Sequence, residues 1–370
     1  MKRVFSVSAI ALASIFARSA VGGVLLIPNT GTGFDNVWAF DSFDGSLVDN
    51  NYIAGDANMQ QVIKVVRNGS GNYYMVDETA DAVFEYGANR LYIQTLANSS
   101  GNGLDQPYSI ALHNNQLYVS VVGGLSPNTV QRFELDGSGQ TTFADFALLG
   151  AGTPRDILFR ANDVLIGDSV GDDIERFDLS GGFLSIWHDS DGATGIDFPN
   201  QLYADANGDI LAAGFTAPFG IYRYDANGAQ LNYWTLPTSP RGVHRLGNGR
   251  ILWSGGTRVG VLDPATGTSA DVLNTPNASF RFITLVADDC LRGDANCDGA
   301  VNNFDIDPFV AAILDPASPT PPPGYSGNAD CWALRLCWGD VSGDDLLNNF
   351  DIDPFVACIL GSPLPGEGCP

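Results

Sequence analysis

A strand pattern that recurs every 41 to 47 residues governs how the middle of this chain can fold. A proline stands three residues before a β-branched residue or leucine four times, at intervals of 47, 45 and 41 residues: Pro107/Ile110, Pro154/Ile157, Pro199/Leu202 and Pro240/Val243. The same spacing leads back to Gln60/Ile63 and forward to Phe280/Ile283. Short strands repeated at this period are typical of a β-propeller, in which each repeat forms one blade.

Each repeat holds four strand segments. The opening strand is followed by alternating apolar residues, as in QLYVS at 116–120, and the third strand ends in Asn-Gly, Asp-Gly or Ser-Gly. These dipeptides are hairpin signals because glycine accepts a positive φ. Six third strands are predicted: Val37–Phe40, Val83–Tyr86, Val130–Leu135, Ile174–Leu179, Ile221–Tyr224 and Val259–Leu262. The sequence therefore predicts a mainly β fold, a six-bladed propeller of four-stranded blades over residues 23–288.

The two ends of this region are complementary. The final strand, Phe280–Val286, has no partners after it, and the first partial blade, Val24–Gly55, lacks an opening strand. Pairing them closes the ring and removes the open sheet edge. An eight-stranded sandwich is the structural alternative, but it does not explain the period.

Two of the units follow a recognisable family pattern. Tyr73–Tyr86 and Val164–Leu179 each read as a strand, an Asp, a polar turn, an Ile or Val, and an aromatic residue. This pattern resembles NHL repeats, and the match is looser in the other blades. The resemblance implies an NHL-like propeller.

Near the C-terminus, the ten residues NNFDIDPFVA at 302–311 recur at 348–357. A run of alternating oxygen-bearing side chains precedes each copy, as a twelve-residue calcium loop requires. We predict two Ca²⁺ sites. The ligands of the first are Asp294, Asn296, Asp298, the Ala300 carbonyl, Asn302 and Asp305, and those of the second are Asp340, Ser342, Asp344, the Leu346 carbonyl, Asn348 and Asp351. The alternative is a pair of Asp- and Asn-rich turns that bind no metal.

The loops differ at the sixth position, where the chain turns sharply. The first has Gly299 and the second Asp345, which takes the turn at a steric cost that glycine avoids. We therefore expect the first site to bind Ca²⁺ more tightly. Proline follows the closing aspartate by three residues, as Pro308 and Pro354. Because proline belongs in the first turn of a helix, we expect the following helices to begin later than usual.

The duplicated segment resembles a type I dockerin over residues 290–370, since each half reads Gly-Asp, alternating ligands, an apolar-Asn pair, a closing Asp and a short apolar helix. The resemblance implies a small α-helical module, here assigned to residues 289–370, with two EF-hand-type loops and a cohesin-like or cell-surface protein partner. It also implies partner contacts at the two residues before each closing aspartate: Asn303, Phe304, Asn349 and Phe350.

The N-terminal residues indicate export. Residues 1–22 read as a signal peptide, with Lys2 and Arg3 ahead of the apolar stretch Val4–Phe16, which is too short to span a membrane. The net charge of −24 argues against nucleic-acid binding. We therefore predict a secreted protein, either free or associated with the cell surface, with no membrane span.

All six cysteines lie in the C-terminal module: Cys290, Cys297, Cys331, Cys337, Cys358 and Cys369. An even number in a small exported module indicates disulfides. Thiolate zinc is disfavoured because the region has no CxxC pair and no histidine. Six cysteines allow fifteen connectivities, and a bond between Cys290 and Cys369, as one example, would join the two ends of the module.

The propeller shows no complete catalytic motif. Asp77, Glu78 and Asp168 follow second strands, and an Asp there is expected to cap the next turn. His113, His188 and His244 lie in different blades, and a single inner-strand His does not reproduce the His and Glu set of streptogramin lyases. Calcium-dependent lactonase propellers use a Glu, an Asn and an Asp on the axis. Asn200, Asp156 and Arg241 lie at the matching distance after the blade-opening prolines, but this set contains no Glu. The tryptophans fit a sugar platform or core packing equally well.

Two functions remain open at this stage. The first is a secreted binding or scaffold protein, a propeller attached through a calcium-binding dockerin-like module to a partner protein or the cell surface. The second is an extracellular hydrolase or lyase acting on a polysaccharide or lactone at the mouth of the propeller. Polar side chains from three or more blades that converge on one mouth around a metal-sized space would favour the second function, whereas a bare or glycine-lined mouth would exclude it.

Overall fold

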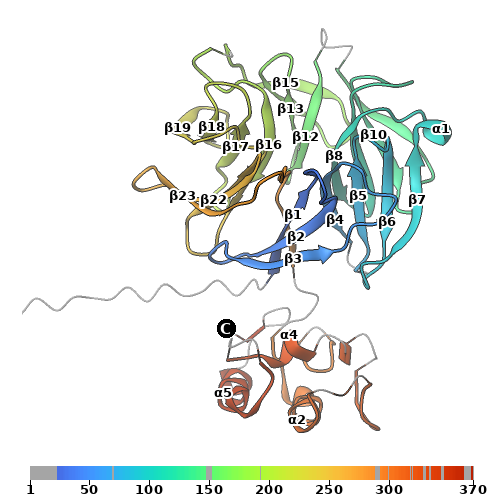
Figure 1. Cartoon of the computed structure of the whole chain (residues 1–370), viewed down its shortest axis with the longest axis vertical. Coiled ribbons are helices and arrows are strands. Elements are labelled where there is room, and N and C mark those ends of the chain that lie inside the picture. The colour runs from blue at the N-terminus through green and yellow to red at the C-terminus, as the bar shows by residue number, and fades with distance from the viewer. Residues whose placement is uncertain are drawn as a thin grey trace, which may run out of the picture. The chain divides into compact units, whose positions relative to one another are not determined.

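The computed structural model describes residues 23–68, 71–146, 152–191, 193–287, 292–298, 300–316, 318, 320–327, 331–332, 335–342, 346–361 and 368–369. The chain forms two compact units, Gly22–Asp289 and one that contains Cys290–Pro370 (Figure 1). The predicted signal peptide, 1–22, lies outside the described residues. Within the described residues, no helix has the length and apolar character needed to cross a membrane.

The first unit consists of six four-stranded antiparallel sheets. From the axis outward, the first three blades are β24 (Thr284–Ala287), β1 (Gly23–Asn29), β2 (Asn36–Asp41) and β3 (Leu47–Ile53); β4 (Val62–Arg67), β5 (Tyr73–Asp77), β6 (Ala82–Tyr86) and β7 (Tyr92–Asn98); and β8 (Pro107–His113), β9 (Gln116–Val121), β10 (Thr129–Glu134) and β11 (Thr141–Asp145). The other three are β12 (Pro154–Phe159), β13 (Val164–Asp168), β14 (Ile174–Phe177) and β15 (Phe183–His188); β16 (Pro199–Ala204), β17 (Ile210–Gly214), β18 (Gly220–Tyr224) and β19 (Gln230–Thr235); and β20 (Gly242–Arg245), β21 (Ile251–Gly255), β22 (Arg258–Asp263) and β23 (Thr268–Asn274). A single short helix, α1 (Ser99–Asn102), follows β7.

The six-bladed, four-stranded architecture is confirmed. All six predicted third strands are the third strands of their blades. The ring closes as expected, because β1 pairs antiparallel with β24 through the partners Val24 and Val286. The closing strand is shorter than predicted: β24 begins at Thr284, and Phe280 forms only isolated bridges to Asn29 and Gly256.

Several inner strands begin with a bulge. The pairing register shifts after Pro107 in β8, Pro154 in β12 and Pro199 in β16. Proline suits the first position of a strand because it donates no hydrogen bond to the sheet. A bulge redirects neighbouring side chains. The residues just after each blade opening thus reach the propeller axis.

Asp156 forms the first of two polar hubs on this axis. Its carboxylate accepts hydrogen bonds from Lys64 Nζ (2.6 Å), Ser109 Oγ (2.7 Å) and the Leu202 backbone N–H (3.0 Å). Asp156 and Lys64 are both buried. Because these residues come from β12, β4, β8 and β16, one carboxylate links four consecutive blades.

Gln201 forms the second hub. Its Oε1 accepts from the backbone N–H groups of Val243 (3.0 Å) and Ile283 (2.9 Å), and its Nε2 donates to the Ile283 carbonyl (2.6 Å). The amide therefore joins β16 to β20 and to the segment that leads into β24. Together the two hubs connect all six blades through side chains.

The second unit contains two copies of one short motif. A 3₁₀ turn, η2 (Asn303–Asp305), leads directly into α2 (Ile306–Leu314), and η3 (Asn349–Asp351) leads into α5 (Ile352–Gly361). A short helix, α4 (Arg335–Gly339), lies between them in sequence. The aromatic rings of Phe309 and Phe355 stack with centroids 3.8 Å apart and an angle of 5° between planes. Equivalent residues of the two copies therefore pack against each other in the core of the module.

The prediction that these helices begin late was wrong. Each helix begins immediately after the closing aspartate, and Pro308 occupies its third position. Backbone N–H groups in the first turn have no acceptor within the helix, so a proline there breaks no helical hydrogen bond.

The disulfides exclude a bond between Cys290 and Cys369. Cys369 pairs with Cys358, 11 residues away, and Cys297 pairs with Cys331. Cys337 is likewise disulfide-bonded, while Cys290 lies outside the described residues. The Cys358–Cys369 bond joins Cys369 to α5, and the Cys369 N–H also donates to the Arg292 carbonyl (2.7 Å) at the start of the module.

The Asp156 hub predicts a non-additive mutational effect. Asp156→Ala leaves the Lys64 ammonium buried without its counter-charge, which should lower the free energy of unfolding by about 3–5 kcal/mol. Lys64→Met combined with Asp156→Ala removes both charges and should recover most of that loss. Urea denaturation of the two single variants and the double variant measures the coupling; additive losses would contradict it.

Candidate functional site

Six residues form a ring at the end of the propeller axis where the inner strands begin. Each directly follows a blade-opening position, and we call this set the mouth ring: Gln61, Tyr108, Arg155, Asn200, Arg241 and Arg281. Contacts connect its members across blades. The Tyr108 hydroxyl donates to Asn200 Oδ1 (3.1 Å), and the Arg155 guanidinium lies 4.2 Å from the centre of the Tyr108 ring. Polar residues from all six blades therefore occupy equivalent positions at this mouth, and those of three blades are in contact.

The aspartates near the ring have structural roles, as predicted. Asp77 accepts hydrogen bonds from the N–H groups of Gln60, Gln61, Thr79 and Ala80. Asp168 accepts from the N–H groups of Thr153 and Val170 (2.7 and 2.9 Å). Both carboxylates thus hold the loops that surround the ring.

Glu78 differs from these aspartates. The Gln61 side-chain amide donates to its carboxylate. Burial lowers the pKa values of Arg155 and Arg281. The negative charge of Glu78 acts in the opposite direction and raises both. It is therefore an acidic neighbour of the ring.

Sequence reasoning placed Asn200, Asp156 and Arg241 together, but the structure separates them. Asn200 and Arg241 belong to the mouth ring, whereas Asp156 lies one residue further along its strand, within the axial hub. The other four ring members were missed. Their signal in the sequence was the position directly after each blade opening, which brings three arginines to one mouth.

The three histidines do not meet. Each packs against an aromatic ring of its own, His113 on Phe159 (4.2 Å between centroids), His188 on Tyr224 (4.3 Å) and His244 on Tyr203 (4.3 Å). All six tryptophans are buried, with at most 7% of their surface exposed. The tryptophans therefore belong to the cores of the two units and provide no sugar platform.

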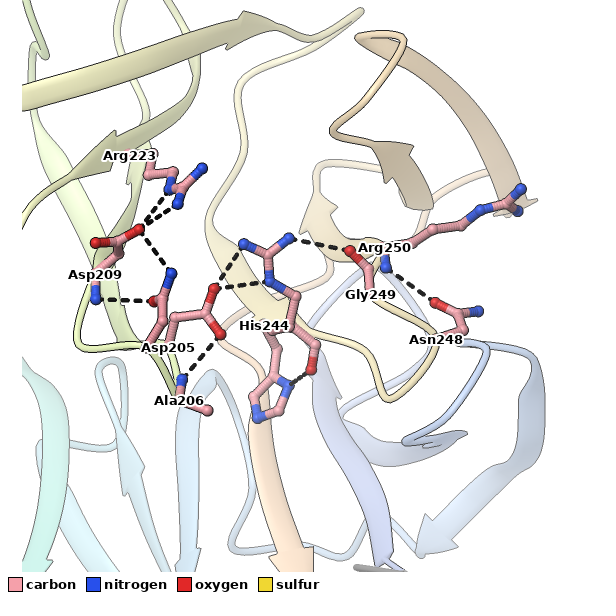
Figure 2. A network of polar contacts seen from close by, with 10 residues as sticks. Asp205, Ala206, Asp209, Arg223, His244, Asn248, Gly249 and Arg250 are labelled. Carbon is pink, nitrogen blue, oxygen red and sulfur yellow. Dashed lines mark hydrogen bonds and ion pairs between the residues drawn. The ribbon is translucent and has the colours of Figure 1, made fainter. Parts of the chain in front are cut away.

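His244 lies in the polar network that Figure 2 shows. Its Nδ1 is 2.7 Å from the Arg245 carbonyl, and Arg245 forms an ion pair with Asp205 (2.6 Å). Burial lowers the pKa of His244 to about 4, against the smaller upward effects of that hydrogen bond and of Asp205. His244 is thus a packed, neutral residue.

The first predicted calcium loop is held by its closing aspartate. Asp305 is buried and accepts from the N–H groups of Asn296 (3.1 Å) and Asn302 (2.8 Å). Burial raises the pKa of Asp305 to about 6, and the nearby charges of Asp294 and Asp298 add to the rise, while the two backbone hydrogen bonds oppose it. The loop thus gathers carboxylates whose repulsion a cation would relieve.

The second loop repeats this arrangement. Asp351 is buried and accepts from the N–H groups of Ser342 (2.8 Å) and Asn348 (2.9 Å). In both halves the predicted ninth-position ligand caps the 3₁₀ turn, since Asn302 Oδ1 accepts from the Phe304 N–H and Asn348 Oδ1 from the Phe350 N–H, each at 2.8 Å. The same local fold therefore serves both copies.

The remaining predicted ligands fall as follows. Asp294 and Asp340 are buried, whereas Asp298, Ser342 and Leu346 are exposed. The Ala300 carbonyl accepts from Asn302 Nδ2 (3.0 Å). Asp344, together with Gly299 and Asp345 at the sixth positions, lies outside the described residues. Among the residues that are described, no three His, Cys, Asp or Glu side chains are grouped so as to hold a metal ion. The two calcium sites stay a prediction.

The donor chemistry of these loops fits a hard cation. Each closing carboxylate oxygen is engaged by one backbone N–H, and a carboxylate has about four lone-pair positions, so further bonds are available. Oxygen ligands of this mixed kind are those that Ca²⁺ prefers.

The helices of the module present an apolar groove of about 330 Å³. It is lined by five residues of α2 and the same five of α5, 46 positions later: Ile306, Phe309, Val310, Ile313 and Leu314, with Ile352, Phe355, Val356, Ile359 and Leu360. Leu314 and Leu360 are 80% and 79% exposed. The predicted partner residues Asn303, Phe304, Asn349 and Phe350 are exposed as well.

Comparison with known proteins identifies the fold and no family. No family model matches the chain, and no curated protein matches it. The chain is similar to a structure of the nidogen/laminin complex (16% identity, TM-score 0.57, covering 73% of this chain and 100% of that one). It also matches a streptogramin B lyase structure (14%, 0.49, 70% and 91%) and a catalytically inactive virginiamycin B lyase from Staphylococcus aureus with quinupristin (13%, 0.48, 74% and 95%). At these identities the first match supports the propeller fold alone.

The environment of His244 predicts a pH-dependent stability. Between pH 6.5 and about 4 the unfolded chain binds a proton at His244 that the folded chain excludes, so stability should fall as the pH drops through this window. His244→Asn removes the titration and keeps a side-chain N–H. The free energy of unfolding of this variant should fall less than that of the wild type, with a difference of up to about 3 kcal/mol at pH 4. Urea denaturation from pH 4 to pH 7.5 measures both slopes, and equal slopes would contradict the assignment.

Proposed function

We propose that this is a secreted binding or scaffold protein, in which a six-bladed propeller presents a ligand-binding mouth and a calcium-binding, dockerin-like module attaches it to a partner protein. The duplicated surface of the C-terminal module carries this proposal. Exposed apolar patches on soluble proteins often mark interaction sites. The groove between α2 and α5 is apolar on every side and is built from one set of residues used twice.

The partner surface begins at the calcium loops. Phe304 and Phe350 are 69% and 70% exposed and directly precede the closing aspartates Asp305 and Asp351. A cation bound by those aspartates would fix the 3₁₀ turns that carry the two phenylalanines. This arrangement supports a docking role that depends on calcium and a module with two equivalent binding halves.

The propeller is suited to presentation as well. One structure similar to this unit is that of nidogen with laminin, which supports a propeller acting as a protein-binding unit. Export is supported by the disulfides of the second unit. A cohesin-like protein or another surface protein is the proposed partner of the module.

A second candidate function rests on the mouth ring. Polar residues from all six blades lie at this mouth, with Glu78 as an acidic neighbour, and this set supports a hydrolase or lyase acting on a polysaccharide or lactone. Glu78→Gln should then abolish turnover and leave binding intact. Release of reducing or unsaturated ends from acidic and neutral polysaccharides would identify such an activity.

Calcium titration tests the loops. The full chain, with its disulfides intact, should bind two Ca²⁺ ions by calorimetry, at least one with a dissociation constant below about 1 mM. Combining Asp294→Asn and Asp305→Asn should remove the tighter site, whereas Asp340→Asn with Asp351→Asn removes the weaker one. Asp307→Asn, an exposed residue of α2, is the matched control and should change neither. Absence of binding in the wild type below millimolar concentration would reject both sites.

The docking surface predicts redundant phenylalanines. Immobilised protein should capture a partner from the extracellular fraction of its host and release it when calcium is chelated. Phe304→Ala or Phe350→Ala alone should leave capture in place, because the other half supplies an equivalent contact. The double variant should lose it. Leu125→Ala, which removes a side chain 85% exposed in the propeller, is the control. Capture that survives both chelation and the double variant would contradict the proposal.

A further inference from the structure

The three arginines of the mouth ring are fixed in place by their surroundings. Arg155 lies over Phe198 (4.6 Å), and its Nε donates to Ser169 Oγ (2.8 Å). Arg241 lies over Phe215 (4.5 Å), whose ring is 5.3 Å from that of Phe198. The phenylalanine pair thus separates and orients two guanidinium groups.

Arg281 completes the set from the closing segment of the ring. It is buried, and its Nε donates to Thr30 Oγ1 (2.7 Å). In both Arg155 and Arg281 the Nε atom is used for support. Within the described part of the chain, the terminal nitrogens of these two side chains make no hydrogen bond.

These arginines lack the carboxylate partners that others in the propeller have. Among the described residues, six arginines lie within 4.0 Å of an aspartate: Arg160, Arg176, Arg223, Arg245, Arg250 and Arg258. Across the described residues, none of the three mouth arginines forms such a pair. This contrast stands out in a chain with 42 acidic and 18 basic residues, where carboxylates are abundant.

Asn200 adds a further unused donor to the same ring. It is fully buried, its Oδ1 accepts from Tyr108, and its Nδ2 has no partner. A buried amide without an acceptor costs about 1–3 kcal/mol. The mouth ring therefore holds an excess of hydrogen-bond donors over acceptors.

The local electrostatics agree with this geometry. Burial lowers the pKa of Arg281 to about 10, and the positive charge of Arg241 lowers it further. Burial also lowers the pKa of Arg155, Tyr108, Glu78 and Asp168 oppose that shift, and Arg241 adds a smaller downward effect. Mutual repulsion of partly desolvated cations is relieved when an anion lies between them.

We propose that the mouth ring binds an oxyanion, a single carboxylate or sulfate group that receives hydrogen bonds from Arg155, Arg241 and Arg281. The planar guanidinium matches such groups through paired hydrogen bonds. The Asp156 and Gln201 hubs fill the axis below the ring, so the ligand binds at the mouth without passing through. The net charge of −24 disfavours long polyanions, which points to a small ligand or one acidic group on a larger one. This proposal is independent of the docking role of the module.

Calorimetry on the full chain at low ionic strength tests the site with four probes: inorganic sulfate, galacturonic acid, N-acetylglutamate and galactose. The acidic probes should bind and galactose should not. Binding of sulfate but of neither organic acid would identify a free inorganic anion as the ligand. Tighter binding of galacturonic acid would identify an acidic sugar as the ligand, and tighter binding of N-acetylglutamate would identify an acidic peptide. Arg155→Gln and Arg241→Gln should each weaken binding by roughly tenfold to a hundredfold, because hydrogen bonds to charged groups are the stronger ones.

The control is Arg258→Gln, which removes a half-exposed arginine paired with Asp271 on the outer part of its blade and should leave the affinity unchanged. Because Arg281 is buried, the Arg281→Gln variant is compared only if its near-ultraviolet circular dichroism matches that of the wild type. The Arg155→Gln and Arg241→Gln variants decide the result in either case. Equal binding of galactose and galacturonic acid, no binding of any acidic probe, or an equal loss in Arg258→Gln would overturn the proposal.

Discussion

The propeller depends on two side chains that bridge its axis. Backbone pairing holds each four-stranded sheet together, and the pairing of β1 with β24 within one sheet closes the ring. Asp156 connects four blades and Gln201 connects the remaining ones, each through short hydrogen bonds in a buried environment. Apolar packing between blades supplies most of the stability, whereas these hubs specify how the six inner strands are arranged around one axis.

This arrangement also determines what the mouth can do. The bulges that turn Asp156 and Gln201 toward the axis place the preceding residues, Arg155 and Asn200, one layer above them. Hub and mouth ring are consecutive positions of the same strands. A filled axis below a donor-rich ring favours binding at the rim. The C-terminal module uses a different device, in which one motif occurs twice and provides two equivalent halves of a surface.

Much of this organisation could be predicted from the sequence. The blade period, the six third strands and the ring closure follow from proline spacing, alternation and Gly-containing turns, which are local signals. The mouth ring could not be predicted in full. Arg155, Arg241 and Arg281 lie at least 40 residues apart in the sequence, and only the closed propeller brings them together. The start of α2 differs from the prediction because the first turn of a helix admits proline at its third position, so Pro308 does not require a later start than Ile306. The Cys358–Cys369 bond is set by tertiary proximity that cysteine spacing does not encode.

Amide hydrogen exchange tests the central role of the axis most directly. The N–H groups of Val243 and Ile283 donate to Gln201 Oε1, so in the wild type they should exchange only when the propeller opens. In Gln201→Leu these two amides should exchange much faster, while those in the outer pairing of Ile221 with Trp234 keep their protection. Unchanged protection of Val243 and Ile283, or an equal loss across all blades, would contradict the account.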